Sequence, residues 1–163
     1  MLVLLPALAH ASPCQQTVDP DASPLLIPAE ELTETLTAQR GCVVLVEVYA
    51  SWCGPCATID PAVTALIEKH RPDGLVALGL SVDTSRGAWM KWREEHARVY
   101  APQQITGWTL AGLTADFAAV GAQFTSAIPL FVLLDTEGRA VMSLTEPTDL
   151  AALDAQISAL LVP

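Results

Sequence analysis

One segment limits the possible folds more than any other: the apolar run at residues 42–50 and the short cysteine motif that follows it. The run reads CVVLVEVYA and is rich in β-branched residues, with no alternation of polar and apolar positions. This pattern is typical of a strand that is buried on both faces, as the strands of parallel sheets are. We therefore expect a sheet that is covered on both sides, and helices are the usual cover.

Helices and strands alternate along most of the chain. Apolar spacing and end signals predict helices at residues 29–40, 55–70, 88–100 and 115–124, the last capped by Thr114, and a closing helix from its cap Thr148 to residue 161. Strands are predicted at residues 42–50, 75–82, 130–135 and 140–144, the last two forming a hairpin around residues 136–139. Residues 101–113 are expected to be irregular. This order predicts an α/β fold with a mixed sheet flanked by helices.

The first 28 residues differ in character from the rest. Residues 1–11 hold a short apolar stretch and an Ala-His-Ala sequence, which resemble part of a secretory signal, although no Lys or Arg precedes the stretch. We expect a truncated or atypical signal peptide there; an upstream start codon and a buried N-terminal segment are the alternatives. Residues 12–28 contain four prolines and predict an extended arm. Residues 29–163 are expected to form one domain.

The charge of the chain argues against one class of partner. Its 163 residues include 8 Lys and Arg against 18 Asp and Glu, which gives a formal net charge of −10. Such a protein would repel a polyanion, so no nucleic acid partner is expected. No apolar run approaches the ~20 residues that a membrane-spanning helix needs.

The candidate chemistry is concentrated in Trp52-Cys53-Gly54-Pro55-Cys56, between the buried strand and the next helix. Zinc needs four ligands, and the other Cys and His residues show no paired spacing, so no metal site is expected. Two core cysteines near a turn are a further alternative, but core packing does not require this sequence. A redox role is favoured because Cys53 would lie at a helix N-terminus, where N–H groups and the helix dipole stabilise a thiolate. Cys56, one turn inside, would be the resolving thiol.

Residues 46–56 resemble the active-site strand and turn of the thioredoxin superfamily. Ile128-Pro129 is similar to the cis-proline loop of that family, residues 135–138 to the turn that follows, and Pro61 to the proline of its active-site helix. The insertion between the second core strand and this loop is similar to that of the TlpA/ResA-like exported thiol–disulfide oxidoreductases. Those proteins often carry an acidic residue where Ile59 stands here. The resemblance implies a thioredoxin-like mixed sheet flanked by helices, with the insertion before the cis-proline loop.

Glu47 lies six residues before Cys53, in a strand otherwise made of apolar residues. Burial would raise the pKa of this carboxyl, and the alternative is a carboxylate at a sheet edge or end, in solvent. The resemblance implies a buried acid that relays a proton to and from Cys56. It also implies a cis bond before Pro129, although a trans proline at the start of a strand is the commoner state.

The resemblance further implies how a substrate would bind. The backbone N–H and C=O of Ile128 would pair with an extended substrate segment, and Pro129 would keep metal or water away from the thiols. Trp52 would pack in the interior or form part of an apolar rim around Cys53. Gly54 and Pro55 are assigned to the same substrate-binding surface.

Cys14 and Cys42 lie outside the motif. In an exported protein they could form a disulfide that ties the arm to the first core strand. The alternative is a buried free thiol at Cys42 and a mobile Cys14.

As a whole, the resemblance implies a protein thiol–disulfide oxidoreductase without a cofactor, in the periplasm or another extracytoplasmic compartment of a bacterium. The Gly-Pro dipeptide between the cysteines resembles the reducing members, which favours a reductase of protein disulfides that is recharged by a membrane electron donor of the DsbD/CcdA type. A dithiol oxidase would run the same chemistry in the opposite direction. A peroxidase and a copper-handling or binding module are disfavoured, because neither a Thr-x-x-Cys motif near a strand end nor a Cys-x-x-x-Cys plus His set is found.

Overall fold

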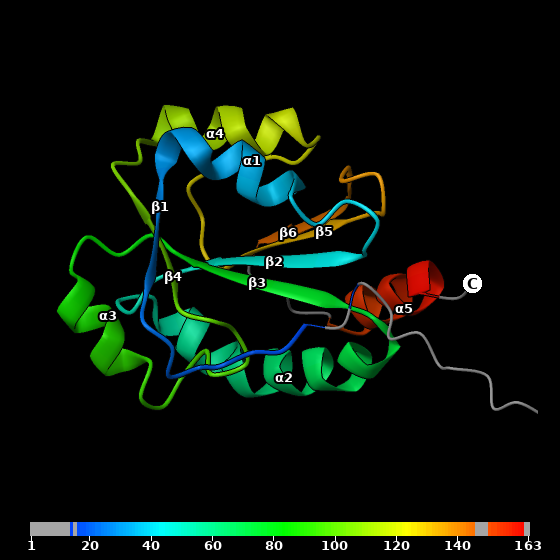
Figure 1. Ribbon diagram of the computed structural model, residues 1–163, viewed down its shortest axis with the longest axis horizontal. Coiled ribbons are helices and arrows are strands. Elements are labelled where there is room, and N and C mark those ends of the chain that lie inside the picture. The colour runs from blue at the N-terminus through cyan, green and yellow to red at the C-terminus, as the bar shows by residue number, and fades with distance from the viewer. Residues whose placement is uncertain (1–13, 15, 146–149, 162–163) are drawn as a thin grey trace, which may run out of the picture.

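The computed structural model describes residues 14, 16–145 and 150–161. Its strands are β1 (Leu25–Pro28), β2 (Val44–Tyr49), β3 (Val76–Ser81), β4 (Gln103–Thr106), β5 (Leu130–Leu134) and β6 (Ala140–Thr145). They form one sheet in the order β1-β4-β3-β2-β5-β6 (Figure 1). The four strands from β1 to β2 are parallel, whereas β5 and β6 run antiparallel to their neighbours. This is the mixed sheet that the sequence predicts.

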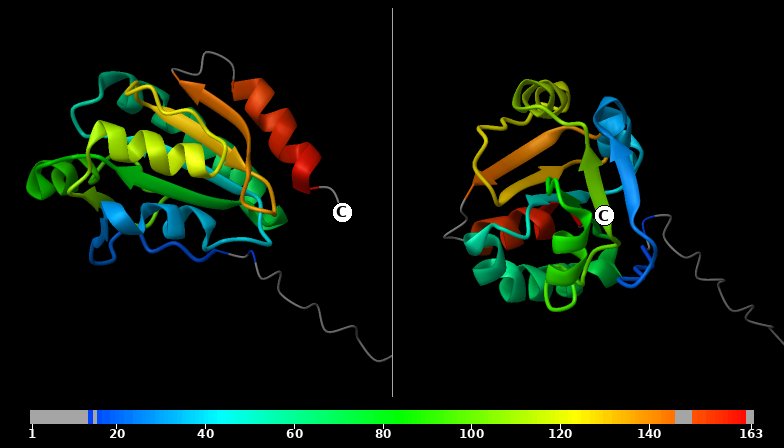
Figure 2. Two further views of the ribbon diagram at one scale, coloured as in Figure 1. Left: turned by 90° about the horizontal axis from the view of Figure 1, so that it is seen from above. Right: turned by 90° about the vertical axis from the view of Figure 1, so that its left-hand side faces the viewer.

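The helices are α1 (Leu32–Thr37), α2 (Gly54–His70), α3 (Arg86–Trp92), α4 (Leu110–Ala119) and α5 (Leu150–Leu161), with short 3₁₀ turns at Ala29–Glu31 and Arg71–Asp73. α1 and α4 pack together on one side of the sheet, and α2 and α5 on the other (Figures 1 and 2). The central strands β2, β3 and β5 are buried along their whole length between these layers. In the part of the chain that the structure describes, no helix is both long and apolar enough to cross a membrane.

The sheet brings three distant segments to one of its edges. β2 and β3 are parallel, so their last residues, Tyr49 and Ser81, lie side by side. β5 is antiparallel to β2, so it begins at this same edge, with Leu130 opposite Val48. The residues that follow β2 and β3 and those that precede β5 therefore meet, and we call this place the C-terminal edge of the sheet, after the ends of β2 and β3.

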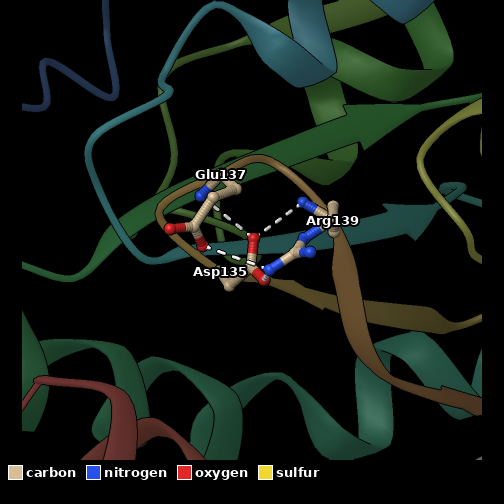
Figure 3. A network of polar contacts seen from close by, with 3 residues as sticks. All are labelled: Asp135, Glu137 and Arg139. Atoms are coloured by element: carbon tan, nitrogen blue, oxygen red, sulfur yellow. Dashed lines mark hydrogen bonds and ion pairs between the residues drawn. The ribbon is translucent and has the colours of Figure 1, made fainter.

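The opposite edge holds the turn between β5 and β6. The Asp135 carboxylate accepts the N–H groups of Glu137 (3.0 Å) and Arg139 (2.9 Å), and it pairs with the Arg139 guanidinium at 3.0 Å (Figure 3). Gly138 takes a left-handed conformation in this turn, with φ +77°. The predicted hairpin is present, and its turn lies next to the start of β2, because the N–H of Gly41 donates to the carbonyl oxygen of Thr136 at 2.7 Å.

The N-terminal part of the described chain runs along the sheet. The side chain of Gln16 accepts the N–H of Ala77 on β3, and β1, formed by the last residues of the predicted arm, pairs with β4. The predicted helix at 29–40 is shorter than expected and begins with a 3₁₀ turn. The closing helix is present as α5, but its predicted cap Thr148 lies outside the described residues.

The prediction of a helix over residues 88–100 is wrong, because α3 ends at Trp92. The buried guanidinium of Arg93 donates to the carbonyl oxygens of Ala97 (2.9 Å) and Tyr100 (2.8 Å), which holds the chain in a turn. Ala97 itself takes a positive φ of 51°. A helical continuation would need different backbone angles at that residue.

Residues 101–113 are not irregular throughout, and the next helix is shifted from its predicted place. β4 extends the sheet between β1 and β3. α4 begins at Leu110 instead of residue 115, because the hydroxyl of Thr109, not that of Thr114, caps it by accepting the N–H of Gly112 at 3.0 Å. It ends before Gly121, whose φ of +84° is typical of the residue that follows a helix.

Candidate active site

Cys53 and Cys56 form a disulfide at the N-terminus of α2, on the C-terminal edge of the sheet. Cys53 is the N-cap residue, and its Sγ accepts the N–H of Cys56 at 3.1 Å. Pro55 stands in the first turn, where its missing N–H leaves no helical hydrogen bond unmade. Both cysteines are buried, with 4% and 1% of their surface exposed. When the disulfide is reduced, the N–H group and the helix dipole would stabilise a thiolate on Cys53.

A buried aspartate, Asp83, holds the turn that carries these cysteines. Its carboxylate accepts the N–H of Ser51 at 2.8 Å and the Ser51 hydroxyl at 2.5 Å. It also accepts the hydroxyl of Ser81, the last residue of β3, at 2.8 Å. Asp83 therefore fixes the chain two residues before Cys53 to the end of the neighbouring strand.

The Ile128–Pro129 peptide bond is cis. The carbonyl oxygen of Ile128 lies 3.6 Å from Cys53 Sγ, so the loop before β5 faces the disulfide. The structure thus brings Ile128 and Pro129 to the cysteines from a part of the sequence more than seventy residues away.

Glu47 lies on β2 with only 3% of its surface exposed, so the alternative of a solvent-facing carboxylate is wrong. Its Oε2 accepts the hydroxyl of Tyr100 at 2.7 Å. Burial raises the pKa of Glu47 from 4.5 to about 7; the hydrogen bond from Tyr100 acts in the opposite direction, and the charge of Asp60 adds to the rise. A carboxyl that titrates near neutral pH can accept and return a proton under physiological conditions.

The surface around Cys53 is open. Trp52 has 66% of its surface exposed, so its side chain does not pack in the interior. Gly54 and Pro55 are also exposed, and a side chain at Gly54 would meet no atom within 4 Å. An exposed indole beside a buried disulfide leaves room for an approaching partner chain.

The structure contains a second disulfide, between Cys14 and Cys42. The alternative of a free thiol at Cys42 is therefore wrong. Both residues are buried, and Cys42 lies two residues before the start of β2, at the opposite edge of the sheet from Cys53. Among the described residues, no group of three or more His, Cys, Asp or Glu side chains could hold a metal ion.

Comparison with known proteins finds similarity to thioredoxins over part of the chain. Residues 25–92 match the family model described as Thioredoxin. The chain is 49% identical to a thioredoxin-like protein of Synechocystis sp. over 45 residues, which are 28% of this chain and 40% of that protein. It is 33% identical to a thioredoxin of Coprinus comatus over 45 residues, 28% of this chain and 42% of that protein. The chain thus spans less than half the length of these curated relatives.

Solved structures match more of the chain. A structure described as the thiol:disulfide interchange protein DsbE of Chlorobium tepidum is 24% identical, with a TM-score of 0.63 over 78% of this chain and 85% of that one. A second, described as a thiol-disulfide oxidoreductase of Bacteroides vulgatus, is 26% identical, with a TM-score of 0.57 over 77% and 78%. StoA from Bacillus subtilis is 15% identical, with a TM-score of 0.54 over 71% and 82%. Over residues 25–92 the chain is similar to the thioredoxin family, and its fold is thioredoxin-like.

Two residues of this candidate site were not predicted from the sequence. Asp83 carries a weak sequence signal, because a lone acidic residue follows a buried strand at the edge where the cysteines were expected. Tyr100 carries none, because it lies 53 residues from Glu47 in a segment that was expected to be helical.

Proposed function

We propose that the protein is an enzyme that exchanges thiols and disulfides with other proteins, with Cys53 as the nucleophile and Cys56 as the resolving thiol. The observation that carries the proposal is the Cys53–Cys56 disulfide at the N-terminus of α2, where the Cys53 sulfur accepts a backbone N–H and faces the cis-proline loop. This environment favours the Cys53 thiolate, and the thiolate is the attacking species in thiol–disulfide exchange.

In the reducing direction, the Cys53 thiolate attacks one sulfur of a substrate disulfide. The substrate S–S bond breaks, one substrate sulfur leaves as a thiolate, and a mixed disulfide forms with Cys53. Glu47 then accepts the proton of the Cys56 thiol, and the Cys56 thiolate attacks Cys53 Sγ. The second substrate sulfur leaves and takes up a proton. Two electrons have passed from the dithiol to the substrate, and Cys53 and Cys56 are joined as a disulfide.

The same site supports a way to hold a protein substrate. An extended substrate segment pairs with the backbone of Ile128 beside Pro129, and the exposed surface of Trp52, Gly54 and Pro55 lies against the substrate. Exposed aromatic side chains suit this task because they bury a large area at a small cost in conformational entropy.

The direction we propose is reduction of protein disulfides in an extracytoplasmic, periplasmic compartment, with a membrane electron donor of the DsbD/CcdA type that recharges the Cys53–Cys56 pair. The second disulfide supports this location, because structural disulfides persist mainly in oxidising compartments. The predicted signal peptide at residues 1–11 lies outside the described residues. The reduction potential of the Cys53–Cys56 pair decides between a reductase and a dithiol oxidase.

The test is reduction of insulin disulfides by the dithiol form of the protein. We expect Cys53→Ser to abolish this activity and Cys56→Ser to accumulate mixed disulfides with partner proteins, visible on non-reducing gels. The matched control is the double variant Cys14→Ala/Cys42→Ala, which should retain turnover. Alkylation at mildly acidic pH that labels Cys56 ahead of Cys53 would contradict the assignment of the nucleophile.

The role of Glu47 is tested separately. Glu47→Gln keeps the side-chain volume but cannot take the Cys56 proton, so resolution of the mixed disulfide at neutral pH should slow about 100-fold, the lower range of general base effects. Turnover measured between pH 6 and pH 9 that is identical to that of the unmodified protein would show that Glu47 is only structural.

A further inference from the structure

The hydroxyl of Tyr100 is the only hydrogen-bond donor that reaches the Glu47 side chain within the described ranges. Its Oη lies 2.7 Å from Glu47 Oε2, and both side chains are almost completely buried. Tyr100 belongs to the loop after α3, so it approaches β2 from outside the sheet. A buried carboxylate with a single protein donor depends strongly on that donor, since no other group compensates its charge by hydrogen bonding.

The Tyr100 ring packs against β3 at a glycine, where no side chain stands in its way. Gly79 is the residue of β3 that pairs with Glu47. A Cβ atom at Gly79 would lie 2.4 Å from two ring carbons of Tyr100 and 2.9 Å from its Cβ, which is closer than atoms can approach. The tyrosine ring therefore occupies the space that a side chain at this position would fill. Glycine in the interior of a strand often marks such a close approach.

Hydrogen bonds also fix the backbone of Tyr100 and of the loop before it. Arg93 donates to the carbonyl oxygen of Tyr100 at 2.8 Å and to that of Ala97 at 2.9 Å. The N–H of Ala97 in turn donates to Asp60 on α2 at 2.8 Å. The loop is thus fixed both to α3 and to the helix that carries Cys56.

Several ionisable groups surround the Glu47 carboxylate. Asp60 of α2 repels its charge, whereas the Tyr100 hydroxyl stabilises it. The Tyr49 oxygen, on β2, accepts N–H groups from Trp89 (3.1 Å) and Arg93 (3.2 Å). Burial holds the pKa of Tyr100 well above 10, with the nearby charge of Glu47 adding to the rise, so Tyr100 keeps its own proton while Glu47 titrates.

We propose that Tyr100 is a positioning residue for the proton transfer between Cys56 and Glu47: its hydroxyl holds Glu47 Oε2 and favours the ionised carboxylate, which takes the Cys56 proton. The proposal rests on the proposed function for its kinetic consequence, but the hydrogen bond can be tested without turnover. In the transfer, the proton of the Cys56 thiol moves to the Glu47 carboxylate and the Cys56 sulfur becomes a thiolate. Tyr100 neither gains nor loses a proton.

The direct test follows the Glu47 carboxyl by ¹³C NMR in the oxidised protein as the pH is raised. Tyr100→Phe removes only the hydroxyl, so the ring still fills the space over Gly79. We expect the titration midpoint of Glu47 in this variant to rise by about one to two pH units, the effect of losing one hydrogen bond to a charged group. The matched control is Tyr49→Phe, which removes another buried hydroxyl whose hydrogen bonds go to Trp89 and Arg93 instead of Glu47, and it should leave the midpoint in place. An unmoved midpoint in Tyr100→Phe would overturn the proposal.

The kinetic test uses the dithiol form. Resolution of the mixed disulfide by Tyr100→Phe should be about 10-fold slower at neutral pH, because a higher pKa leaves less of Glu47 ionised, and it should recover at higher pH. Adding Tyr100→Phe to Glu47→Gln should slow resolution no further. A lower melting temperature with an unchanged pH profile would make Tyr100 merely structural and overturn the proposal. If the unmodified protein reduces no disulfide, the proposed function fails, and the NMR titration still decides the role of Tyr100.

Discussion

The two ends of β2 each carry a disulfide, and their surroundings differ. At the start of the strand, Cys42 pairs with Cys14, 28 residues away in sequence; beyond the end of the strand, Cys53 pairs with Cys56, three residues away. The Cα atoms are 5.4 Å and 5.3 Å apart, and all four cysteines are buried. Separation of the backbones and burial therefore do not distinguish a structural disulfide from a redox-active one.

The neighbouring groups distinguish them. Cys53 Sγ accepts a helix N-terminal N–H, whereas Cys14 Sγ lies 3.5 Å from the carbonyl oxygen of Gly41. A carboxyl that titrates near neutral pH, Glu47, lies on the strand that leads to Cys53. The Cys42 end instead has the rigid turn built on Asp135. Under the proposed function, the Cys42 end of β2 serves stability and the Cys53 end carries the chemistry.

The free energy of unfolding should depend most strongly on the Cys42 end of β2. Cys14→Ala/Cys42→Ala should lower the free energy of unfolding by about 3–4 kcal/mol, because the disulfide closes a long loop in the unfolded chain. The Cys53–Cys56 disulfide closes a much shorter loop. Cys53→Ala/Cys56→Ala should therefore lower the free energy of unfolding by only about 1–2 kcal/mol in the same chain-entropy description. Urea denaturation of both double variants under oxidising conditions measures the difference. Equal losses would show that the Cys14–Cys42 disulfide has no special role in stability.

At the Cys53 end of β2, the stability of the protein should depend on pH. The pKa of Glu47 is raised from 4.5 in the unfolded chain to about 7 in the folded protein. Between these values the folded state binds more protons, so stability should fall as the pH rises through this window. Relative to Glu47→Gln, the oxidised protein should lose about 3 kcal/mol between pH 4 and pH 8. A difference between the two proteins that stays constant with pH would show that Glu47 does not carry a buried charge.

The smallest predicted change in stability comes from Asp135, at the Cys42 end, and its pH dependence is opposite to that of Glu47. Burial disfavours the charge of Asp135, but hydrogen bonds from the backbone and guanidinium of Arg139 and the backbone of Glu137 outweigh it and hold the pKa of Asp135 below 3.8. The stabilisation is therefore present above that value and is lost as the pH falls below it. Asp135→Asn should cost about 1–2 kcal/mol at neutral pH, with the difference shrinking in acid. The Asp135→Asn variant should reduce insulin as fast as the unmodified protein. Loss of that activity would show that the Cys42 end also contributes to the chemistry.

The sequence predicted the parts of the molecule whose signals are local. The apolar run before Cys53 is a buried strand because both of its faces are covered, and continuous hydrophobicity reports such burial directly. The helix after it begins at the cysteine motif for the same local reason, since Pro55 suits a first turn. Cys53, Cys56 and Glu47 could therefore be singled out without any knowledge of their contacts.

The remaining features depend on contacts between distant residues. α3 ends early because Arg93 turns inward to bind carbonyl oxygens, and an arginine in a helical pattern gives no sign of that. β4 was missed because Gln104 is polar, yet its buried amide donates to the carbonyl oxygen of Asp83 at 2.7 Å. The pairing of Cys14 with Cys42 was left open, because it depends on the path of the N-terminal chain along the sheet.

Graded reduction shows whether Cys53–Cys56 is redox-active and Cys14–Cys42 structural. The oxidised protein is exposed to increasing concentrations of dithiothreitol, quenched with acid and alkylated, and the labelled cysteines are identified by mass spectrometry. We predict that Cys53 and Cys56 become labelled together at low reductant while Cys14 and Cys42 remain bonded. Labelling of all four cysteines at the same concentration, or of Cys14 and Cys42 first, would contradict these assignments.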